Sequence, residues 1–508
     1  MPAKTVMFQG TASHVGKSVL TAALCRILRD QGLRVAPFKA MNMSNNAFVT
    51  ADGGEMATAQ AAQAMACGVA PSVEMNPVLL KVMSDSRCQA ILLGRPYAVI
   101  EAGELGNHRE VLLAAIRGAL NRLLERYEFV VLEGAGSPAE INLQRTDLAN
   151  MEAARLAGSP VVLVADIERG GVFAQLVGTL ELLSPEERRR IRGFVINKFR
   201  GDPRILRPGL RWLEERTGLP VFGVLPFFQD LDLPEEDSLA DRFSKSVPGT
   251  GAVPGTVCGE MRIDVLRYPT MANFTDLDPL HKEPGVVIRY LQRPPGNGSK
   301  PHLIILPGSK STMADLTWLR ERGLDRYLEQ CAQEGTEVLG ICGGFQMLGE
   351  MLTDPGRTES QTTAMPGLGL LPTSTLFLAS KITAQVRGTH LESGFPVRGY
   401  EIHCGRPQGL RRGRPVFRIE ERGGVAAQET DGCELPEKRI WGTYLHGLFD
   451  EEGFRRWTID GLRERKGLVP PARPAVESTN DPYAGWAQRV RQNVQVGRLM
   501  DEVMAWTP

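Results

Sequence analysis

Residues 5–32 read TVMFQGTASHVGKSVLTAALCRILRDQG: a short apolar run, a loop rich in glycine and hydroxyl side chains, and a helical pattern. In the last part Val19, Ala23 and Ile27 repeat at helical spacing, and Gly32 is a natural C-terminal stop. A glycine loop between a strand and a helix is the context in which a phosphate-binding loop is expected. The stretch therefore predicts the start of an α/β domain.

The loop itself carries the residue types that hold phosphates. Glycines let backbone N–H groups close around phosphate oxygens, and the helix N-terminus adds positive potential. We expect Lys17 to reach the outer phosphates and Ser18 to ligate Mg²⁺. The spacing is unusual, because Thr11 takes the place of the first glycine, and a simple turn before a helix stays the alternative. The candidate nucleotide-binding residues are Gly10, Thr11, Ser13, Gly16, Lys17, Ser18 and Lys39.

Carboxylates elsewhere in the first half could complete a metal site. Glu133 ends the apolar run EFVVLE, at the sheet edge where α/β proteins bind ligands. Asp52 and Glu55, in ADGGEM, are further acidic candidates, and Lys39 could face the same crevice. Each of these side chains could equally be an ordinary surface residue.

Further apolar runs in the first half predict a parallel sheet with crossover helices. They are continuous and rich in β-branched residues, as strands buried on both faces are. We expect this phosphate-loop domain to span residues 1–235, followed by a linker rich in Pro, Gly and charge over 236–258. The runs are RVAPFKA, EFVVLEGAG, PVVLVAD, GFVINKF and PVFGVLPF.

Strands resume after the linker and predict a second α/β domain over 259–455 with its own sheet. The residues from 456 to 508 have the pattern of a helical tail. The strands expected in the second domain are MRIDVLRYP, GVVIRYLQ, HLIILPGS, EVLGIC, RGYEIHCG and IWGTYLHG.

Residues 338–349, VLGICGGFQMLG, place Cys342 between a strand and a helix with two glycines behind it. A nucleophile on such a turn stands clear of its sheet, and the helix N-terminus favours the thiolate. A thiol also needs a base, and His446, in GTYLH, follows in the usual Cys-before-His order. Taken singly, Cys342 could be a small core residue and His446 a buried structural histidine.

Oxyanion donors and an orienting group would complete this second constellation. The N–H of Gly343 is one donor, and the turn at Gly308 and Ser309 could supply another. We expect Cys342 and the histidine to act as a dyad, with Glu401, in GYEIH, as a candidate to hold the ring.

Composition limits the function classes. The 508 residues carry 59 basic and 59 acidic side chains, so neither nucleic acid nor an anionic membrane is an expected partner. No apolar run reaches the length of a membrane span, and the start of the sequence leads us to expect no signal peptide. Eight cysteines without a CxxC pair argue against a disulfide framework or zinc site, so a reducing cytoplasm is expected.

Both halves resemble known enzymes. The second half resembles the class I glutamine amidotransferases, in which Cys342 would form the thioester and His446 would be its base. Many members carry a glutamate two residues after the histidine, where this chain has Leu448. The first half resembles dethiobiotin synthetase in GTASHVGKS, FKA and LEGAG. Joined in one chain, the halves resemble the CobB/CobQ family, whose cobyrinate-amidating branch also lacks that glutamate.

The resemblance implies a glutamine-dependent amidating ligase with ATP and Mg²⁺ as cofactors. QGTASHVGKSVL, APFKAMNMSNNA, VLEGAGSPAEINL and GICGGFQMLG are similar to the branch that acts on adenosylcobyrinic acid a,c-diamide. There ATP phosphorylates a carboxylate, and ammonia from glutamine displaces the phosphate, at the b, d, e and g positions, to give adenosylcobyric acid in cobalamin biosynthesis. The sister branch, which amidates the a and c carboxylates, is the nearest alternative. A phosphate-loop ATPase switch with an inactive amidotransferase-like domain is another, and a homo-oligomer stays open.

Overall fold

In the computed structural model the apolar runs of the first half form one parallel six-stranded sheet, which confirms the predicted α/β class. The structure describes residues 3–144, 146–228, 260–296, 300–408, 412–469 and 481–507, so the linker predicted at 236–258 lies outside the described residues. In spatial order the strands are β12 (Val221–Pro226), β11 (Ile191–Phe199), β10 (Val161–Asp166), β1 (Lys4–Gly10), β9 (Phe129–Glu133) and β2 (Val35–Phe38).

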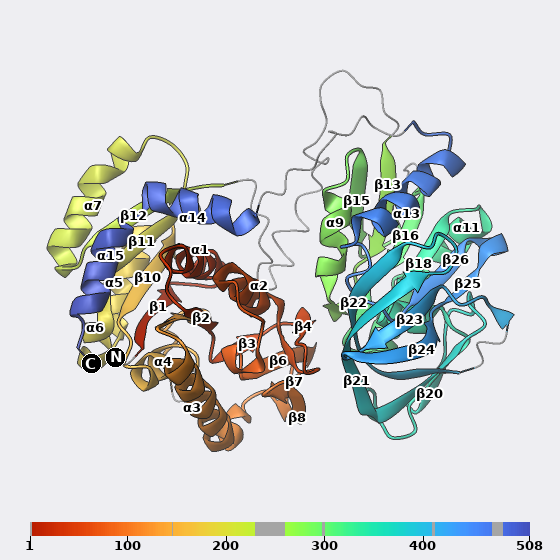
Figure 1. Cartoon of the computed structure of the whole chain (residues 1–508), viewed down its shortest axis with the longest axis horizontal. Helices are drawn as coiled ribbons and strands as arrows, with labels where there is room; N and C mark the ends of the chain where they lie inside the picture. The colour runs from red at the N-terminus through yellow and green to blue at the C-terminus, as the bar shows by residue number, and fades with distance from the viewer. Residues whose placement is uncertain are drawn as a thin grey trace.

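Helices cover both faces of this sheet (Figure 1). Met7 of β1 belongs to the same apolar cluster as Ile116 and Leu176 on one face, whereas its neighbour Phe8 clusters with Leu20 on the other. The alternation follows from the two-residue repeat of a strand. The helices are α1 (Lys17–Asp30), α2 (Thr58–Cys67), α3 (Arg109–Arg126), α4 (Met151–Leu156), α5 (Val172–Leu182), α6 (Pro185–Arg190) and α7 (Pro203–Thr217).

A small β layer extends the first domain toward the second, and sequence analysis did not predict it. It consists of a four-stranded sheet and a two-stranded hairpin inserted between β2 and α3. In Figure 1 these strands lie at the boundary between the two bodies. They are β3 (Met41–Met43), β6 (Val78–Ser84), β7 (Arg87–Leu92) and β8 (Arg95–Glu101), and the hairpin strands β4 (Ala47–Val49) and β5 (Glu55–Ala57).

The second domain has a mainly parallel sheet at its centre, as predicted. In order its strands are β15 (Val286–Leu291), β13 (Met261–Leu266), β16 (Leu303–Leu306), β18 (Glu337–Ile341), β26 (Ile440–Thr443) and the antiparallel β25 (Cys433–Leu435). Short elements around it are β14 (Met271–Ala272), β17 (Gly308–Ser309), α9 (Asp278–His281), α10 (Thr312–Glu321), α11 (Leu324–Gln333) and α12 (Gly343–Leu348).

A separate, largely antiparallel sheet faces the first domain. Its two longest strands form a hairpin that reaches the β layer of the first domain, where Ile402 joins an apolar cluster with Val49 and Leu79. The strands are β19 (Met351–Thr353), β20 (Ala364–Pro366), β21 (Ser374–His390), β22 (Pro396–Gln408), β23 (Phe417–Arg422) and β24 (Val425–Asp431).

The predicted tail divides between the two bodies. Helix α13 (Glu452–Arg465) packs in the second domain, where Phe454 and Ile459 join the core. Helices α14 (Pro482–Asn493) and α15 (Val496–Ala505) lie against the first domain, where Trp486 and Val503 enter the cluster of α1. Figure 1 shows these helices, in blue, beside α1 and the edge of the parallel sheet.

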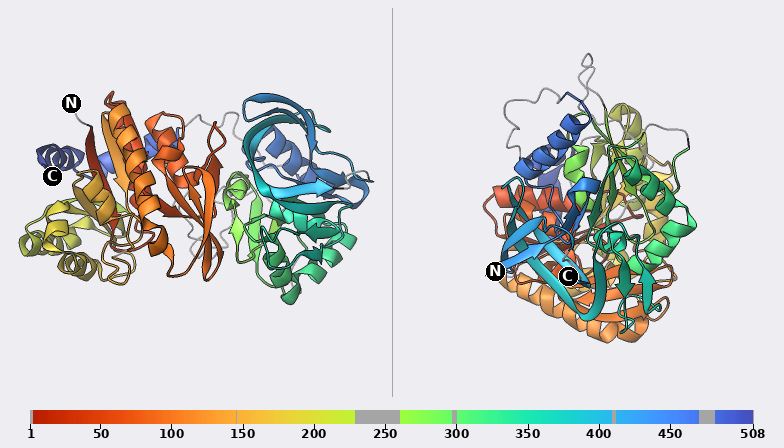
Figure 2. Two further views of the ribbon diagram at one scale, coloured as in Figure 1. Left: turned by 90° about the horizontal axis from the view of Figure 1, so that it is seen from below. Right: turned by 90° about the vertical axis from the view of Figure 1, so that its right-hand side faces the viewer.

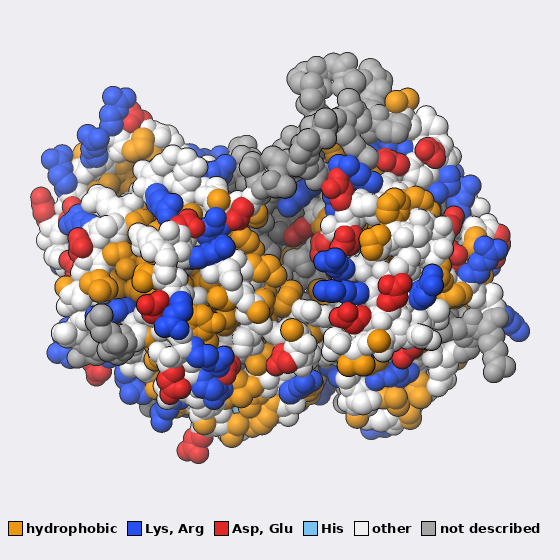
Figure 3. Space-filling view, viewed as in Figure 1, with side chains coloured by type: hydrophobic (Ala, Val, Ile, Leu, Met, Phe, Trp, Pro, Cys, Tyr) orange, Lys and Arg blue, Asp and Glu red, His pale blue; other side chains and the backbone are white. Residues whose placement is uncertain are grey.

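The two bodies lie side by side along the long axis of the molecule (Figure 2). Basic and acidic side chains are interspersed on the face drawn in Figure 3, in keeping with the zero formal net charge. Within the part of the chain that the structure describes, no helix is both long enough and apolar enough to cross a membrane.

Candidate active sites

The loop after β1 has the geometry of a phosphate cradle. An added Cβ on Gly16, whose φ is 99°, would lie 2.1 Å from Asn197 Nδ2. At Gly10 it would lie 2.7 Å from the carbonyl of Ala12 and 3.0 Å from Lys17 Nζ. Side chains other than hydrogen are therefore excluded at both positions, which leaves the backbone N–H groups accessible at the start of α1.

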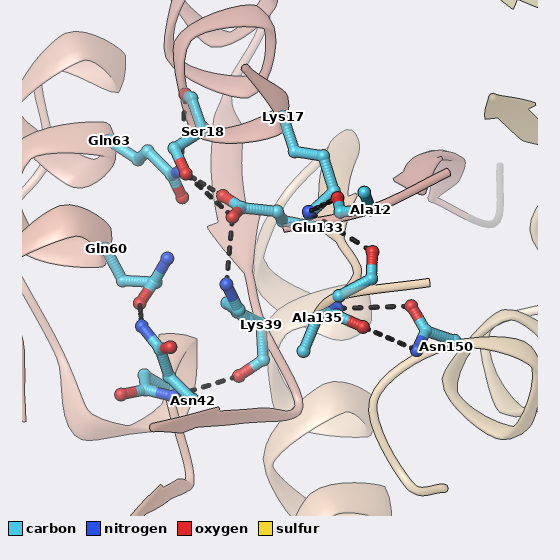
Figure 4. Close-up of polar contacts among 12 residues, drawn as sticks. Ala12, Lys17, Ser18, Lys39, Asn42, Gln60, Gln63, Glu133, Ala135 and Asn150 are labelled. Carbon is cyan, nitrogen blue, oxygen red and sulfur yellow. Dashed lines mark hydrogen bonds and ion pairs between the residues drawn. The ribbon is translucent and has the colours of Figure 1, made fainter. Parts of the chain in front are cut away.

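Lys17 is held at the mouth of this loop. Its Nζ donates to the carbonyls of Ala12, at 3.2 Å, and Gly136, at 3.3 Å (Figure 4). Burial lowers the pKa of Lys17, while the charge of Glu133 opposes this shift. An ammonium held only by neutral carbonyls is ready to exchange them for anionic phosphate oxygens.

Glu133 is the centre of a buried polar cluster, as Figure 4 shows. Its Oε1 accepts from Ser18 Oγ at 2.8 Å and from Lys39 Nζ at 2.9 Å, and its Oε2 accepts from Gln63 at 2.5 Å. Burial alone would raise the pKa of Glu133, but the charge and hydrogen bond of Lys39, the hydrogen bond of Gln63 and the charge of Lys17 lower it below its ordinary value. The carboxylate is therefore ionised beside the Ser18 hydroxyl, and this pair of hard oxygen donors suits Mg²⁺.

The remaining loop residues lie around this cradle. Thr11 Oγ1 donates to Gln175 at 3.1 Å, which ties the loop to α5. Ser13 is exposed at the loop tip near Gly136.

Asp52 and Glu55 have their partners outside the phosphate site, contrary to the expectation that Asp52 ligates the metal there. Asp52 is exposed and contacts Thr50 and Arg95, both outside the loop. Both acidic residues belong to the β4–β5 hairpin, which turns toward the second domain. The sequence analysis expected them near Glu133, but Glu55 instead binds Lys81 and Lys381, which line the cavity at Cys342.

Cys342 sits on a strained turn at the carboxyl end of β18. Its φ of 50° and ψ of −105° are unusual for a residue with a side chain. The turn is possible because Gly343 and Gly344 follow, where an added Cβ would lie 2.7 Å from Ser309 N and 1.9 Å from Leu306 O, respectively. The thiol is thus presented at the N-terminus of α12, above the sheet edge.

His446 reaches the same point from the neighbouring strand. β18 and β26 are parallel partners, so residues just past their carboxyl ends meet. The ring stacks on Tyr400, with centroids 5.3 Å apart and planes inclined by 20°. Cys342 and His446 line one cavity, and the structure therefore brings the two predicted catalytic residues together.

Asp276 holds the histidine, and sequence analysis missed it. Its Oδ2 lies 2.7 Å from His446 Nδ1, while its Oδ1 accepts from the N–H of Gly447 at 2.8 Å. Burial would lower the pKa of His446, but the Asp276 carboxylate and the Cys342 thiol raise it to about 10. The ring therefore holds its proton across the neutral pH range.

Glu401 does not orient the ring. Its carboxylate is bound instead by Arg422, at 2.9 and 3.2 Å, on the adjoining part of the antiparallel sheet. Leu448, at the position where many amidotransferases carry glutamate, is fully buried in the core. The acidic partner comes from the segment after β13 instead, and only the general tendency of polar groups to gather at the carboxyl edge of a parallel sheet pointed there.

The predicted oxyanion residues lie beside this pair. Gly343 packs against the backbone of Ser309, and an added Cβ on Gly308 would lie 3.0 Å from His446 Cε1. Ser309 Oγ donates to Asp315 at 2.6 Å, which fixes the turn. Gly308 and Ser309 line the same cavity as Cys342, and Gly343 follows it in the chain, so the backbone N–H groups of all three are candidates for oxyanion donors.

The first domain hydrogen-bonds directly to the segment of the second domain that contacts His446. Asn273 Nδ2 lies 3.2 Å from His446 Nε2, while its Oδ1 accepts from the N–H of Ala47 at 3.0 Å. Asn46 Oδ1 accepts in turn from the N–H of Phe274 at 2.9 Å. Asn273, with φ of 51°, therefore links the histidine of one domain to the backbone of the other.

His403 is also near this cavity, but it has a structural setting. It stacks on Tyr444 at 4.0 Å between centroids, and its Nδ1 lies 2.7 Å from the carbonyl of Gly405. Burial lowers its pKa to about 3. Among the described residues, no group of three or more His, Cys, Asp or Glu side chains could hold a metal ion by itself.

Comparison with known proteins supports the domain type expected for each half of the chain. Residues 6–240 match the CobQ/CobB/MinD/ParA nucleotide binding domain, and residues 262–454 match the CobB/CobQ-like glutamine amidotransferase domain. The chain is similar to the cobyric acid synthase of Moorella thermoacetica, with 48% identity over 99% of each chain. It is also similar to the cobyric acid synthase of Pelotomaculum thermopropionicum, with 50% identity over 92% of this chain and 89% of the relative. A structure of PurLQS from Thermotoga maritima covers 40% of this chain and 99% of its own, with 19% identity and a TM-score of 0.31.

Proposed function

Because the chain belongs to the cobyric acid synthase family, we propose that it amidates adenosylcobyrinic acid a,c-diamide with ATP and glutamine. The b, d, e and g carboxylates become amides, and the product is adenosylcobyric acid in cobalamin biosynthesis. The second domain releases ammonia from glutamine, and the first domain activates the carboxylate that receives it. The free Cys342 thiol requires reducing surroundings, so we propose a cytoplasmic location.

In the glutamine half, we assign Cys342 as nucleophile and His446 as its base. The histidine takes the thiol proton before sulfur attacks the carboxamide carbon, and it gives that proton to the departing ammonia. Asp276 stabilises the imidazolium during this step and fixes the ring orientation. N–H groups at Gly343 and at the Gly308–Ser309 turn stabilise the oxyanion, and water then hydrolyses the thioester.

In the phosphate half, the loop binds ATP, and Lys17 draws the outer phosphates into line with the carboxylate to be activated. Ser18 and Glu133 are the residues that would hold Mg²⁺, which supplies charge neutralisation on the phosphates when it is bound. Lys39 keeps Glu133 ionised and in place through a pair in which both side chains are fully buried. Removing one member of such a buried pair typically costs about 3–5 kcal/mol, so Lys39 supports the site structurally as well.

The observation that carries this proposal is the joint placement of Cys342 and His446 in a cavity that the first domain helps to line, through Lys81, Gln89 and Pro96. A glutaminase centre at the contact with a phosphate-loop domain is what a transfer of ammonia between them requires. An unrelated thiol enzyme would not need a cavity that is lined in part by a phosphate-loop domain.

The direct experiment is mass spectrometry of adenosylcobyrinic acid a,c-diamide after incubation with ATP, Mg²⁺ and glutamine labelled with heavy nitrogen at the amide. We expect labelled amides to accumulate up to adenosylcobyric acid, and no product without ATP. If cobyrinic acid were amidated only at the a and c carboxylates, the sister activity would replace this proposal. If ATP were hydrolysed without any amide product, the switch hypothesis would replace it.

A further inference from the structure

The cavity at Cys342 has a charged wall that the thiol chemistry leaves unexplained. Three lysines line it, Lys81, Lys310 and Lys381, together with Glu359. Thiol, base and oxyanion donors need none of these side chains. A wall of this kind beside a nucleophile indicates recognition of a charged ligand.

Two of the lysines already share a carboxylate partner. Glu55, which is fully buried, binds Lys81 at 2.7 Å through Oε2 and Lys381 through Oε1. Burial would raise the pKa of Glu55, but the two ammonium groups lower it to about 2. The triad formed by Glu55, Lys81 and Lys381 is therefore a fixed structural unit that spans the two domains.

Lys310 differs from them. It follows Ser309 directly, and within the described residues its ammonium makes no direct ion pair or hydrogen bond, although the charge of Glu359 acts on it through space. Burial, followed by repulsion from Lys381 and Lys81, lowers its pKa to about 8. The group is thus a cation on the wall of the thiol cavity that has no direct anionic partner.

Glu359 is the complementary case. Its Oε1 accepts from the N–H of Thr312, but its Oε2 is buried and, among the described residues, has no hydrogen-bond partner. Burial raises the pKa of Glu359 to about 7. The loop that carries Glu359 is held in place by Asp354. Its carboxylate accepts from the N–H groups of Thr358, at 2.8 Å, Glu359, at 2.8 Å, and Ser360, at 2.9 Å. A buried, unpartnered carboxylate oxygen costs free energy unless a donor arrives.

We propose that Lys310 binds the α-carboxylate of glutamine and that Glu359 binds its α-ammonium, so that these two side chains select a free α-amino acid for Cys342. This assignment rests on the proposed glutaminase function. The zwitterion supplies one anion and one cation, which can bond directly to the Lys310 ammonium and to the open Oε2 of Glu359. Placing both charges fixes the far end of the ligand, and the carboxamide then extends along the cavity toward the thiol.

The test uses ligands that lack one charge each. Glutaramate lacks the α-ammonium but keeps a carboxylate, and γ-aminobutyramide lacks the α-carboxylate but keeps an ammonium. Ammonia release from glutamine and from each analogue is measured by kcat/KM in the full-length protein. Where an analogue is not turned over, its inhibition constant against glutamine hydrolysis gives the same comparison.

For Lys310→Met we expect a loss of about tenfold or more with glutamine and with glutaramate, and little change with γ-aminobutyramide, because charge-assisted contacts are lost only where the ligand has the matching group. For Glu359→Gln, an isosteric change, we expect the opposite pattern, with glutaramate spared. Lys310→Arg, which keeps the charge, should recover part of the loss.

Lys381→Met is the matched control, because it removes a lysine from the same wall that already has a carboxylate partner. Its effect should be the same for all three amides. If Lys310→Met or Glu359→Gln also weakened all three equally, the assignment of that residue would be wrong. A wild-type protein that released no ammonia from glutamine would contradict the proposed function instead, so the two failures are distinguishable.

Discussion

The phosphate site and the thiol site differ in how much of the chain each one needs. The phosphate site lies within one domain, and its loop, Lys39 and Glu133 all come from adjacent strands of one parallel sheet. The thiol site draws Cys342, His446 and Asp276 from three segments of the second domain. In addition, Asn46 and Ala47 of the first domain hydrogen-bond to the Asn273–Phe274 segment beside His446. The first site is self-contained, whereas the second depends on the contact between domains.

The sharpest test of this separation is Cys342→Ala. Glutamine-dependent amidation should disappear, because the thioester cannot form, while amidation with high ammonium at alkaline pH should persist, because only neutral ammonia attacks an acyl phosphate. Product is measured by mass spectrometry, and a thermal melt checks the fold. Loss of the ammonium reaction in a folded variant would mean that Cys342 also acts in the synthetase step.

Lys17→Ala should have the converse effect. Amide synthesis should fall below detection with either nitrogen source, because the outer phosphates lose their ammonium partner. Glutamine hydrolysis, followed as glutamate release without ATP, should remain. Amidation near the wild-type rate at saturating ATP would remove Lys17 from the nucleotide site.

Asp276→Asn should reduce glutamine hydrolysis by about 10³-fold, because an amide cannot stabilise the imidazolium. Amidation from ammonium is the internal control and should be unchanged. If hydrolysis fell by less than about tenfold, His446 would work as the dyad expected from the sequence.

The same variant has a predicted pH signature in stability. The Asp276 carboxylate and the Cys342 thiol raise the pKa of His446 to about 10 despite its burial. A raised pKa in the folded state adds stability that is complete below the unfolded value of about 6.5 and is lost as pH rises toward the folded value. The melting temperature of Asp276→Asn should therefore fall furthest below wild type near pH 6, and the difference should shrink as the pH approaches 10. A constant difference would show that the pair contributes no proton linkage.

Asn46→Ala tests the dependence of the thiol site on the other domain. Its side chain accepts from Phe274 N, next to the asparagine that contacts His446, so we expect glutamine hydrolysis to fall several-fold. ATP-dependent amidation with ammonium should stay within about twofold of wild type. Equal losses in both assays would show that Asn46 also serves the synthetase reaction.

The smallest effect is expected for Glu401→Gln. Its partner is Arg422 rather than His446, so hydrolysis of glutamine should change by less than about twofold. A loss as large as that of Asp276→Asn would restore Glu401 as the orienting group.

The physical reasons for success and failure of the sequence analysis differ between these sites. The six strands of the first sheet and the Gly10–Ser18 loop were predictable, because strand burial and backbone-driven phosphate binding leave local patterns. Cys342 was predictable for the same reason, since a strained turn needs adjacent glycines. Asp276 was not, because a carboxylate distant in the chain reaches His446 only through the order of strands in the sheet. Asp52 was misplaced because a short hairpin reversed its direction.

The course of the chain makes the amidotransferase domain an insertion within the phosphate-loop domain. The chain leaves the first domain after β12 and returns to it as α14 and α15, where Trp486 and Val503 fill part of its core. The two bodies are therefore joined by two covalent tethers. Cutting a protease site engineered into 236–258 would not separate them, and a gene divided there would leave Trp486 and its neighbours on the wrong polypeptide. Independent expression of the synthetase domain thus requires a fusion of 1–235 with 481–508, rather than a truncation.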